Sequence, residues 1–113
     1  MRERRKYVRV ISNLALRYKI EEEFVTGAGS YDIGGGGIRI ITGEGIPAGS
    51  VLSVEIDLPD HARTIPARAR VVWAQDMGNG FWEVAMEFTE IEARDRDKVL
   101  KHAYFSYKKT DEV

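Results

Sequence analysis

The sequence predicts a mainly β protein, a small six-stranded antiparallel barrel followed by one C-terminal helix. Between residues 14 and 88, short runs alternate apolar and polar side chains with a period of two, and turns rich in glycine or proline separate them. After residue 89 the apolar residues recur at intervals of three and four, which is typical of an amphipathic helix. A chain of 113 residues fits one domain, so we treat residues 1–113 as a single unit.

Six strands account for the alternating runs. The clearest covers residues 51–58, in which Leu52, Val54 and Ile56 share one face and polar side chains the other. Four successive glycines separate the second strand from the third, and further Gly and Pro residues mark other turns. The predicted strands cover residues 14–20, 24–32, 38–41, 51–58, 65–74 and 81–88.

The last two strands carry both tryptophans. Alternation places Trp73, Trp82 and Phe88 in the core and leaves Phe81 exposed. A binding platform for single-stranded nucleic acid needs such rings on the surface, so this assignment disfavours one. Pro66 cannot donate a ladder hydrogen bond, which indicates an edge position or a bulge near the start of the fifth strand.

The helix is predicted over residues 90–108. Thr89, followed three residues later by Glu92, is the capping-box signature of a helix start. Acidic residues crowd the first turns, whereas Lys108 and Lys109 come late, and this order suits the helix dipole. The chain therefore divides into a flexible basic arm (1–11), a β-barrel (12–88) and the helix (90–108).

The net charge of -1 conceals a strong asymmetry. Residues 1–19 hold seven Lys or Arg against one Glu, a net charge of +6, and the rest of the chain carries -7. A basic arm on an acidic body predicts an anionic partner at one end. It argues against the broad basic footprint of a DNA- or RNA-binding domain.

Other function classes are disfavoured by what the chain lacks. It has no cysteine, and its two histidines, His61 and His102, fall in a turn and on the predicted helix. No Ser-His-Asp set, metal-ligand spacing or P-loop is present, so we expect no enzyme activity, no metal and no cofactor. No apolar run approaches the roughly 18 residues of a membrane span, so we expect a cytoplasmic protein without membrane insertion.

Two segments could bind a ligand, and the first is the arm. Arg5 and Arg9 lie four residues apart and Arg4 precedes them. The guanidinium fork binds phosphate oxygens bidentately and pairs equally well with the edge of guanine. A solvated basic tail is the alternative interpretation of the same residues.

The second segment runs from Asp32 to Gly37 and contains four consecutive glycines. These glycines leave backbone N–H groups uncovered, so that a ligand can approach closely. The Asp32 carboxylate can accept the N1–H and N2–H₂ donors of a guanine. A tight connection between two strands, with Asp32 capping the turn, is the alternative.

Together the two segments resemble the motifs of the PilZ domain, R-x-x-x-R and [D/N]-x-S-x-x-G. Arg5 and Arg9 match the first motif, and Asp32 and Gly37 match the ends of the second, while Gly34 replaces its serine. The similarity continues through the later strands and the closing helix and covers nearly the whole chain.

The resemblance implies a receptor for the bacterial second messenger cyclic di-GMP. Arg5 and Arg9 would clamp guanine edges and phosphates, Asp32 would bind a guanine, and Gly37 would allow close backbone approach. Arg4 would add a contact where the family's residue influences how many ligand molecules fit. Gly34 removes a hydroxyl contact. Binding would order the arm and signal to an unidentified downstream protein; the alternative is a PilZ-like protein-interaction module that binds no nucleotide.

Overall fold

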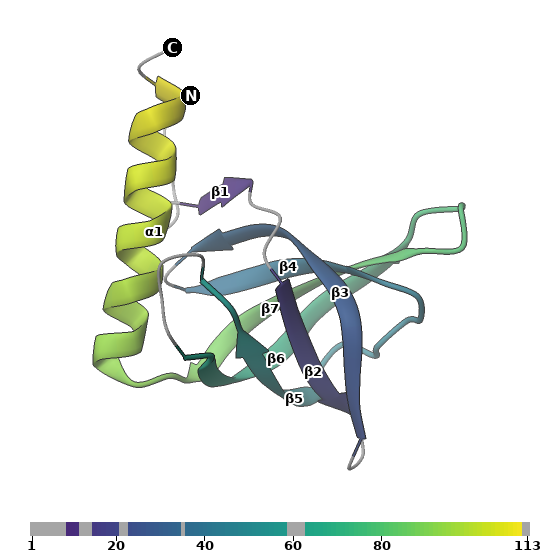
Figure 1. Ribbon diagram of the computed structural model, residues 1–113. Helices are drawn as coiled ribbons and strands as arrows, with labels where there is room; N and C mark the ends of the chain where they lie inside the picture. Colours follow the sequence, from purple (N-terminus) through teal and green to yellow (C-terminus); the bar gives the residue numbers. More distant parts are fainter. Residues whose placement is uncertain (1–8, 12–14, 21–22, 35, 59–62, 112–113) are drawn as a thin grey trace.

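Seven antiparallel strands form one sheet, and a single helix, α1 (Ala93–Asp111), packs beside it (Figure 1). The computed structural model describes residues 9–11, 15–20, 23–34, 36–58 and 63–111. The strands are β1 (Arg9–Ile11), β2 (Ala15–Ile20), β3 (Glu23–Gly34), β4 (Gly37–Thr42), β5 (Val51–Ile56), β6 (Ile65–Asp76) and β7 (Trp82–Glu90).

Strand pairing wraps six of these strands around one core. Neighbours follow in the order β2, β5, β6, β7, β4, and the long strand β3 pairs with β4 as well as with β2. The predicted mainly β fold, with six antiparallel strands and a C-terminal helix, is confirmed. Its core holds the inward side chains of every second residue, as the alternation requires. The largest fully buried apolar side chains are Tyr18, Ile33, Ile40, Ile56, Ile65, Val54, Val71, Val84 and Val99.

The seventh strand, β1, corrects the prediction of a free arm over residues 1–11. Arg9–Ile11 pairs with the end of β3. Three residues are too few to show a period of two, so only the long-range pairing reveals them as a strand. Residues 1–8 of the predicted arm lie outside the described residues.

The tryptophans are placed differently from the prediction. Ile65, Ala67, Ala69 and Val71 are buried in turn, but a register shift between Val71 and Trp73 changes the phase of β6. Trp73 is therefore 38% exposed, and its predicted place in the core is wrong. In β7 the side chain of Phe88 is buried, that of Trp82 is partly buried, and that of Phe81, just before the strand, is exposed.

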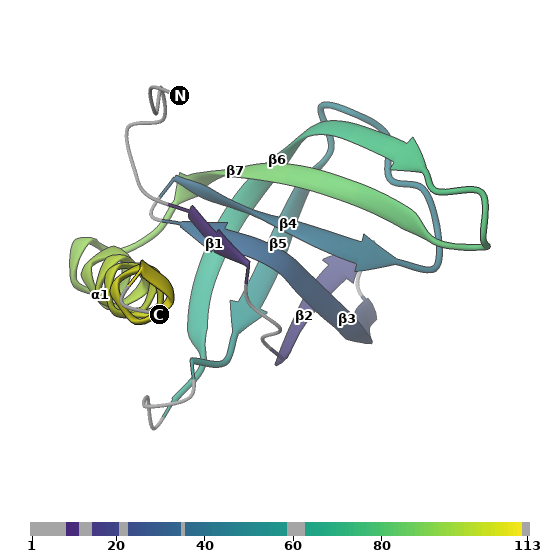
Figure 2. The ribbon, with the colours of Figure 1, turned by 90° about the horizontal axis from the view of Figure 1, so that it is seen from above.

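The helix begins later than predicted. β7 continues to Glu90, which still pairs with β6, so Thr89 lies in a strand and the capping box it suggested is wrong. The first helical hydrogen bond runs from the Arg96 N–H to the Glu92 carbonyl, at 2.9 Å. Helix α1 then passes beside β1 and the end of β3, as the view from above shows (Figure 2). Val99 and Ala103 are its buried side chains within the part whose burial is described.

Candidate functional site

The register of β1 against β3 brings together the two segments singled out in the sequence. Arg9 lies opposite Gly34, and Ile11 lies opposite Asp32. For Arg9 and Asp32 the structure describes the course of the backbone. The second arginine of R-x-x-x-R thus starts a strand that pairs directly with the Asp32 end of the glycine loop. Arg4 and Arg5 lie outside the described residues.

A tight hairpin joins β3 to β4 at this point. Gly34 pairs with Gly37, and the two are linked by a two-residue turn. The Phe88 N–H donates to the Gly36 carbonyl at 2.9 Å, which fastens the turn to β7. The loop between the two strands is therefore held by backbone contacts on its β7 side.

Gly37 has a packing reason of its own. A Cβ atom at this position would lie 2.1 Å from the Met86 carbonyl oxygen of the neighbouring strand, far inside van der Waals contact. The close approach that Gly37 makes within the described residues is thus to β7. Its predicted approach to a ligand is a separate role, which this contact neither requires nor excludes.

A row of cross-strand partners extends from the two segments across the barrel wall. Gly37 pairs with Glu87 of β7, and Glu87 pairs with Arg70 of β6. The Arg70 guanidinium donates to the Glu87 carboxylate, and both side chains are about half exposed. Beyond the glycine pair the row therefore ends in an ion pair that leaves little net charge.

Arg39 is a basic residue that the sequence analysis did not single out. Its backbone lies opposite Asp32, and its Nη1 atom lies 2.8 Å from Glu83 Oε1 of β7. The Arg39 side chain is 27% exposed. The one available sequence signal was a charged residue between two apolar β-formers directly after the glycine loop. This arrangement puts a cation, balanced by a carboxylate, beside the Asp32 position.

Helix α1, which flanks β1 and β3, is anchored at its first turn by a buried charge. Asp95 is 0% exposed, and Arg63 Nη2 donates to its Oδ1 atom at 3.0 Å. Lys98 Nζ lies 3.9 Å from the same oxygen. The sequence suggested a simple helix-start charge at Asp95, and the structure adds a long-range partner from the loop before β6. This pair fixes the start of the helix against the barrel.

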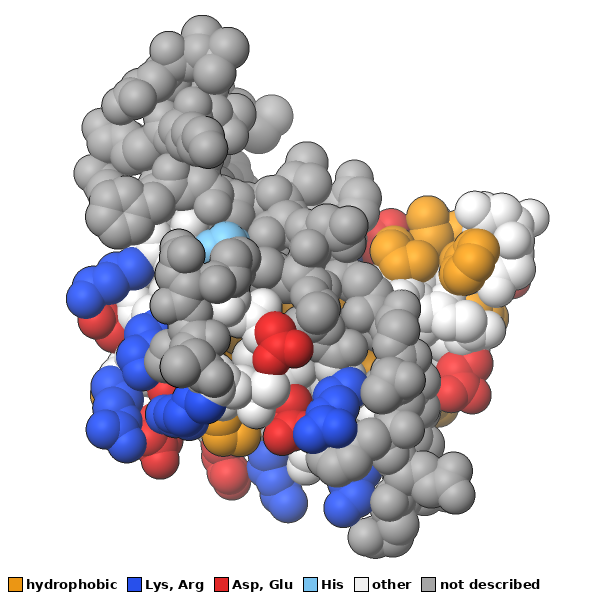
Figure 3. All heavy atoms as spheres, viewed as in Figure 1, with side chains coloured by type: hydrophobic (Ala, Val, Ile, Leu, Met, Phe, Trp, Pro, Cys, Tyr) orange, Lys and Arg blue, Asp and Glu red, His pale blue; other side chains and the backbone are white. Residues whose placement is uncertain are grey.

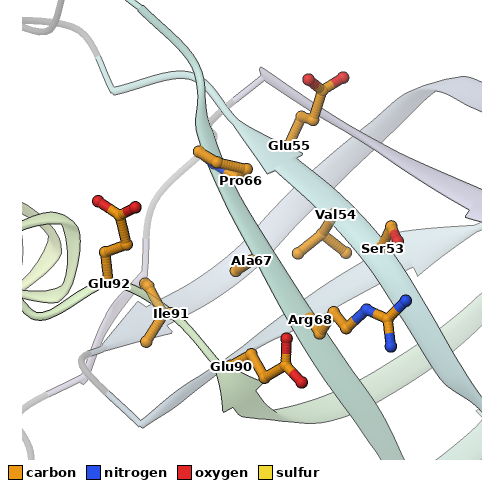
Figure 4. A pocket seen from close by; sticks show the side chains of 9 residues that line it. All are labelled: Ser53, Val54, Glu55, Pro66, Ala67, Arg68, Glu90, Ile91 and Glu92. Atoms are coloured by element: carbon orange, nitrogen blue, oxygen red, sulfur yellow. The ribbon is translucent and has the colours of Figure 1, made fainter.

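A hollow of about 600 Å³ lies near the same end of the barrel, between β5, β6 and the link from β7 to α1 (Figure 4). Glu55, Arg68, Glu90 and Glu92 bring mixed charges to its walls. None of the predicted site residues lines it. Glu55 is already paired with Arg17 of β2, so this hollow adds nothing to the candidate site.

Histidine and metal chemistry find no centre in the described part of the chain. His61 lies outside it, and His102 is a partly buried residue of α1. Among the residues that are described, no group of three or more His, Asp or Glu side chains could hold a metal ion. No described helix is both long and apolar enough to span a membrane.

Comparison with known proteins identifies the domain type. The family model described as the PilZ domain matches residues 3–105. A comparison by sequence with curated proteins finds no match.

Two solved structures resemble the chain closely in three dimensions. The inhibitor of motility MotI/DgrA of Bacillus subtilis is 28% identical, with a TM-score of 0.83 over 95% of this chain and 53% of that protein. The chain thus spans about half of MotI. The PilZ domain of YcgR from Escherichia coli, solved with c-di-GMP, is 16% identical, with a TM-score of 0.71 over 98% of this chain and 100% of that domain. At that identity the likeness to YcgR shows the fold alone.

Proposed function

The chain belongs to the PilZ domain family, and from that premise we propose that it binds cyclic di-GMP through its arginine motif and its glycine loop. The observation that carries the proposal is the register of β1 against β3. It puts Arg9 opposite Gly34 and leaves the Asp32 backbone two residues away along the same pair of strands. A ligand that needs both motifs finds them side by side.

Each motif has a distinct chemical task in this proposal. The ligand carries two phosphates and two guanines. Arg5 and Arg9 offer guanidinium forks that pair bidentately with phosphate oxygens or with the O6 and N7 edge of guanine. Asp32 accepts hydrogen bonds from the N1–H and N2–H₂ groups of a guanine. Arg4 supplies a further cation beside Arg5, and Gly37 keeps the approach to the backbone clear.

Gly34 sets the expected strength of binding. The family motif has a serine here, and the glycine removes one hydroxyl contact to a charged ligand. The loss of such a hydrogen bond costs about 1.5–3 kcal/mol. We therefore expect an affinity roughly ten- to a hundredfold below that of a serine-containing motif on an otherwise equal site.

The signal follows from neutralising the arm. Residues 1–19 carry a net charge of +6, and a dianionic ligand pairs with several of these cations at once. Contacts from both motifs order the arm against the end of β3, next to β1 and α1. A partner protein then meets a changed surface, in the cytoplasm. The activity is that of a regulatory binding module without catalysis.

Titration calorimetry on the purified chain tests this proposal. We expect saturable binding of cyclic di-GMP and none of GTP or a short oligonucleotide at the same concentrations. Equal binding of all three anions would reduce the arm to a non-specific basic tail.

A PilZ-type module that acts on a protein partner without nucleotide is the second candidate, and Gly34 favours it. Under that interpretation the folded chain gives no heat with cyclic di-GMP, and circular dichroism shows an intact β-rich fold. Restoring the serine in Gly34→Ser would then also fail to produce binding.

A further inference from the structure

The hairpin between β6 and β7 extends beyond the barrel, away from α1 (Figure 1). Four large apolar side chains along it are exposed: Val72 by 50%, Trp73 by 38%, Met77 by 44% and Phe81 by 50%. Single exposed apolar residues are common on proteins, but a contiguous group marks an interaction surface. Hydrophobic side chains gather on this hairpin in the space-filling view (Figure 3).

A hollow of about 560 Å³ adjoins the group. Residues 45–48, in the loop after β4, form one wall, and residues 72–74 of β6 form the other, together with Trp82. The indole of Trp82 would lie 3.1 Å from a Cβ atom at Gly45, so the absence of a side chain there lets the loop approach the ring. We call the exposed residues Val72, Trp73, Met77 and Phe81, with this hollow, the hairpin surface.

The exposure follows from a specific feature of the backbone. Strand alternation from Ile65 to Val71 would bury Trp73 if it continued. The register shift between Val71 and Trp73 prevents this and keeps the indole accessible.

The charges around the hairpin surface all have one sign. Residues 43–50 and 72–83 contain Glu44, Asp76 and Glu83 but no Lys or Arg. Glu83 is paired with Arg39 of β4, whereas Glu44 and Asp76 are exposed. The surface is thus an apolar group with an acidic rim.

From this combination we infer that the hairpin surface docks a partner protein segment whose apolar side chains are flanked by Lys or Arg. Apolar anchors would enter the hollow beside Trp82, and basic side chains would meet Glu44 and Asp76. A second copy of this chain fits poorly, because a symmetric contact would bring the carboxylates of both copies together. The inference names the partner chemistry for the proposed signalling role and rests on that role, but its test needs no nucleotide.

Intrinsic fluorescence offers a local readout, because the chain has two tryptophans and both line the hollow. The probe is a helical peptide with Leu at spacings of three and four and Lys elsewhere, and the control peptide has Glu in place of Lys. The Leu–Lys peptide should shift the emission of the full chain saturably, and the Leu–Glu peptide should leave it unchanged.

Variants locate the binding. Phe81→Ser and Glu44→Lys should each weaken the Leu–Lys peptide at least tenfold. Val51→Ser, at an apolar side chain 55% exposed outside the hairpin surface, and Asp57→Lys, at an exposed carboxylate after β5, are the matched controls and should change little.

Equal binding of the two peptides, or equal effects of the test and control variants, would overturn the inference. So would self-association of the free chain in sedimentation that Phe81→Ser abolishes, since the occupant would then be a second copy. Calorimetry with cyclic di-GMP on Phe81→Ser separates the two proposals. Nucleotide binding that persists while the peptide fails removes the docking surface alone, and the reverse result removes the nucleotide proposal alone.

Discussion

Arg9 of β1 and Gly34 of β3 are register partners, although 24 residues separate them in the chain. The pairing continues through Gly37 to Glu87 and Arg70 in a single row across the barrel wall. The arginine motif and the glycine loop are therefore parts of one stretch of sheet. This relationship gives the proposed nucleotide site a physical basis, and the predictions below test the elements that build it.

Gly37→Ala should destabilise the fold by about 1–3 kcal/mol, the usual cost of forcing extra volume into a packed site. The new Cβ would meet the Met86 carbonyl oxygen at 2.1 Å, and a backbone atom in a central strand pair cannot swing aside. Urea unfolding measures the effect. Gly43→Ala is the matched control, because nothing lies within 4 Å of its added Cβ. Equal stability of the two variants would show that β4 and β7 separate easily.

Arg63→Ala should cost about 1–3 kcal/mol, because it removes the hydrogen-bond partner of a fully buried carboxylate, Asp95. Arg94→Ala breaks an exposed pair with Glu92, whose atoms are 3.5 Å apart, and should cost less than about 1 kcal/mol. Thermal unfolding of both variants gives the comparison. A harmless Arg63→Ala would mean that the start of α1 is not held by this pair.

Tyr18 makes stability depend on alkaline pH. Burial in the core, and secondarily the negative charge of Glu44, raise the pKa of its hydroxyl above 10.0. In the unfolded chain the group ionises near pH 10, so this stabilising contribution is complete below that pH and is lost as the pH rises towards the folded pKa. Tyr18→Phe removes the contribution.

Urea midpoints at pH 8, 10 and 11 compare the parent with Tyr18→Phe. Other tyrosines and lysines titrate in both proteins, so the difference between the two isolates Tyr18. We expect the parent to lose more stability than the variant above pH 10. Parallel losses would contradict the assignment.

Gly34→Ser should tighten binding of cyclic di-GMP about tenfold or more, since it restores the hydroxyl of the family motif. Calorimetry on the variant measures the gain. Gly43→Ser, in the loop after β4 with no atom within 4 Å of its Cβ, should leave the affinity unchanged. An unaltered affinity in Gly34→Ser would show that the missing hydroxyl does not limit binding.

Local patterning predicted most of the fold and failed where long-range contacts decide. β5 follows its alternation, with Leu52, Val54 and Ile56 buried, because one face of that strand packs on the core. Trp73 departs from its pattern because a bulge arises from pairing with β7, which no local window contains. Thr89 stays in a strand for the same reason, since β6 still pairs with the residue after it.

The candidate site was predictable only in part. The sequence showed two ligand-type segments, and a family resemblance joined them. Their meeting at Arg9 and Gly34 depends on a three-residue strand too short to show a period. The pairs of Arg39 with Glu83 and of Arg63 with Asp95 join residues 44 and 32 positions apart, so no spacing rule could have proposed them.

The central claim is that both motif arginines bind cyclic di-GMP, and one calorimetric series tests it most directly. The parent chain, Arg5→Ala, Arg9→Ala and the control Arg94→Ala are each titrated with the nucleotide, and circular dichroism verifies their folds. We predict saturable binding for the parent and Arg94→Ala and no measurable binding for Arg5→Ala or Arg9→Ala. An affinity unchanged in either motif variant, with the fold intact, would contradict the account.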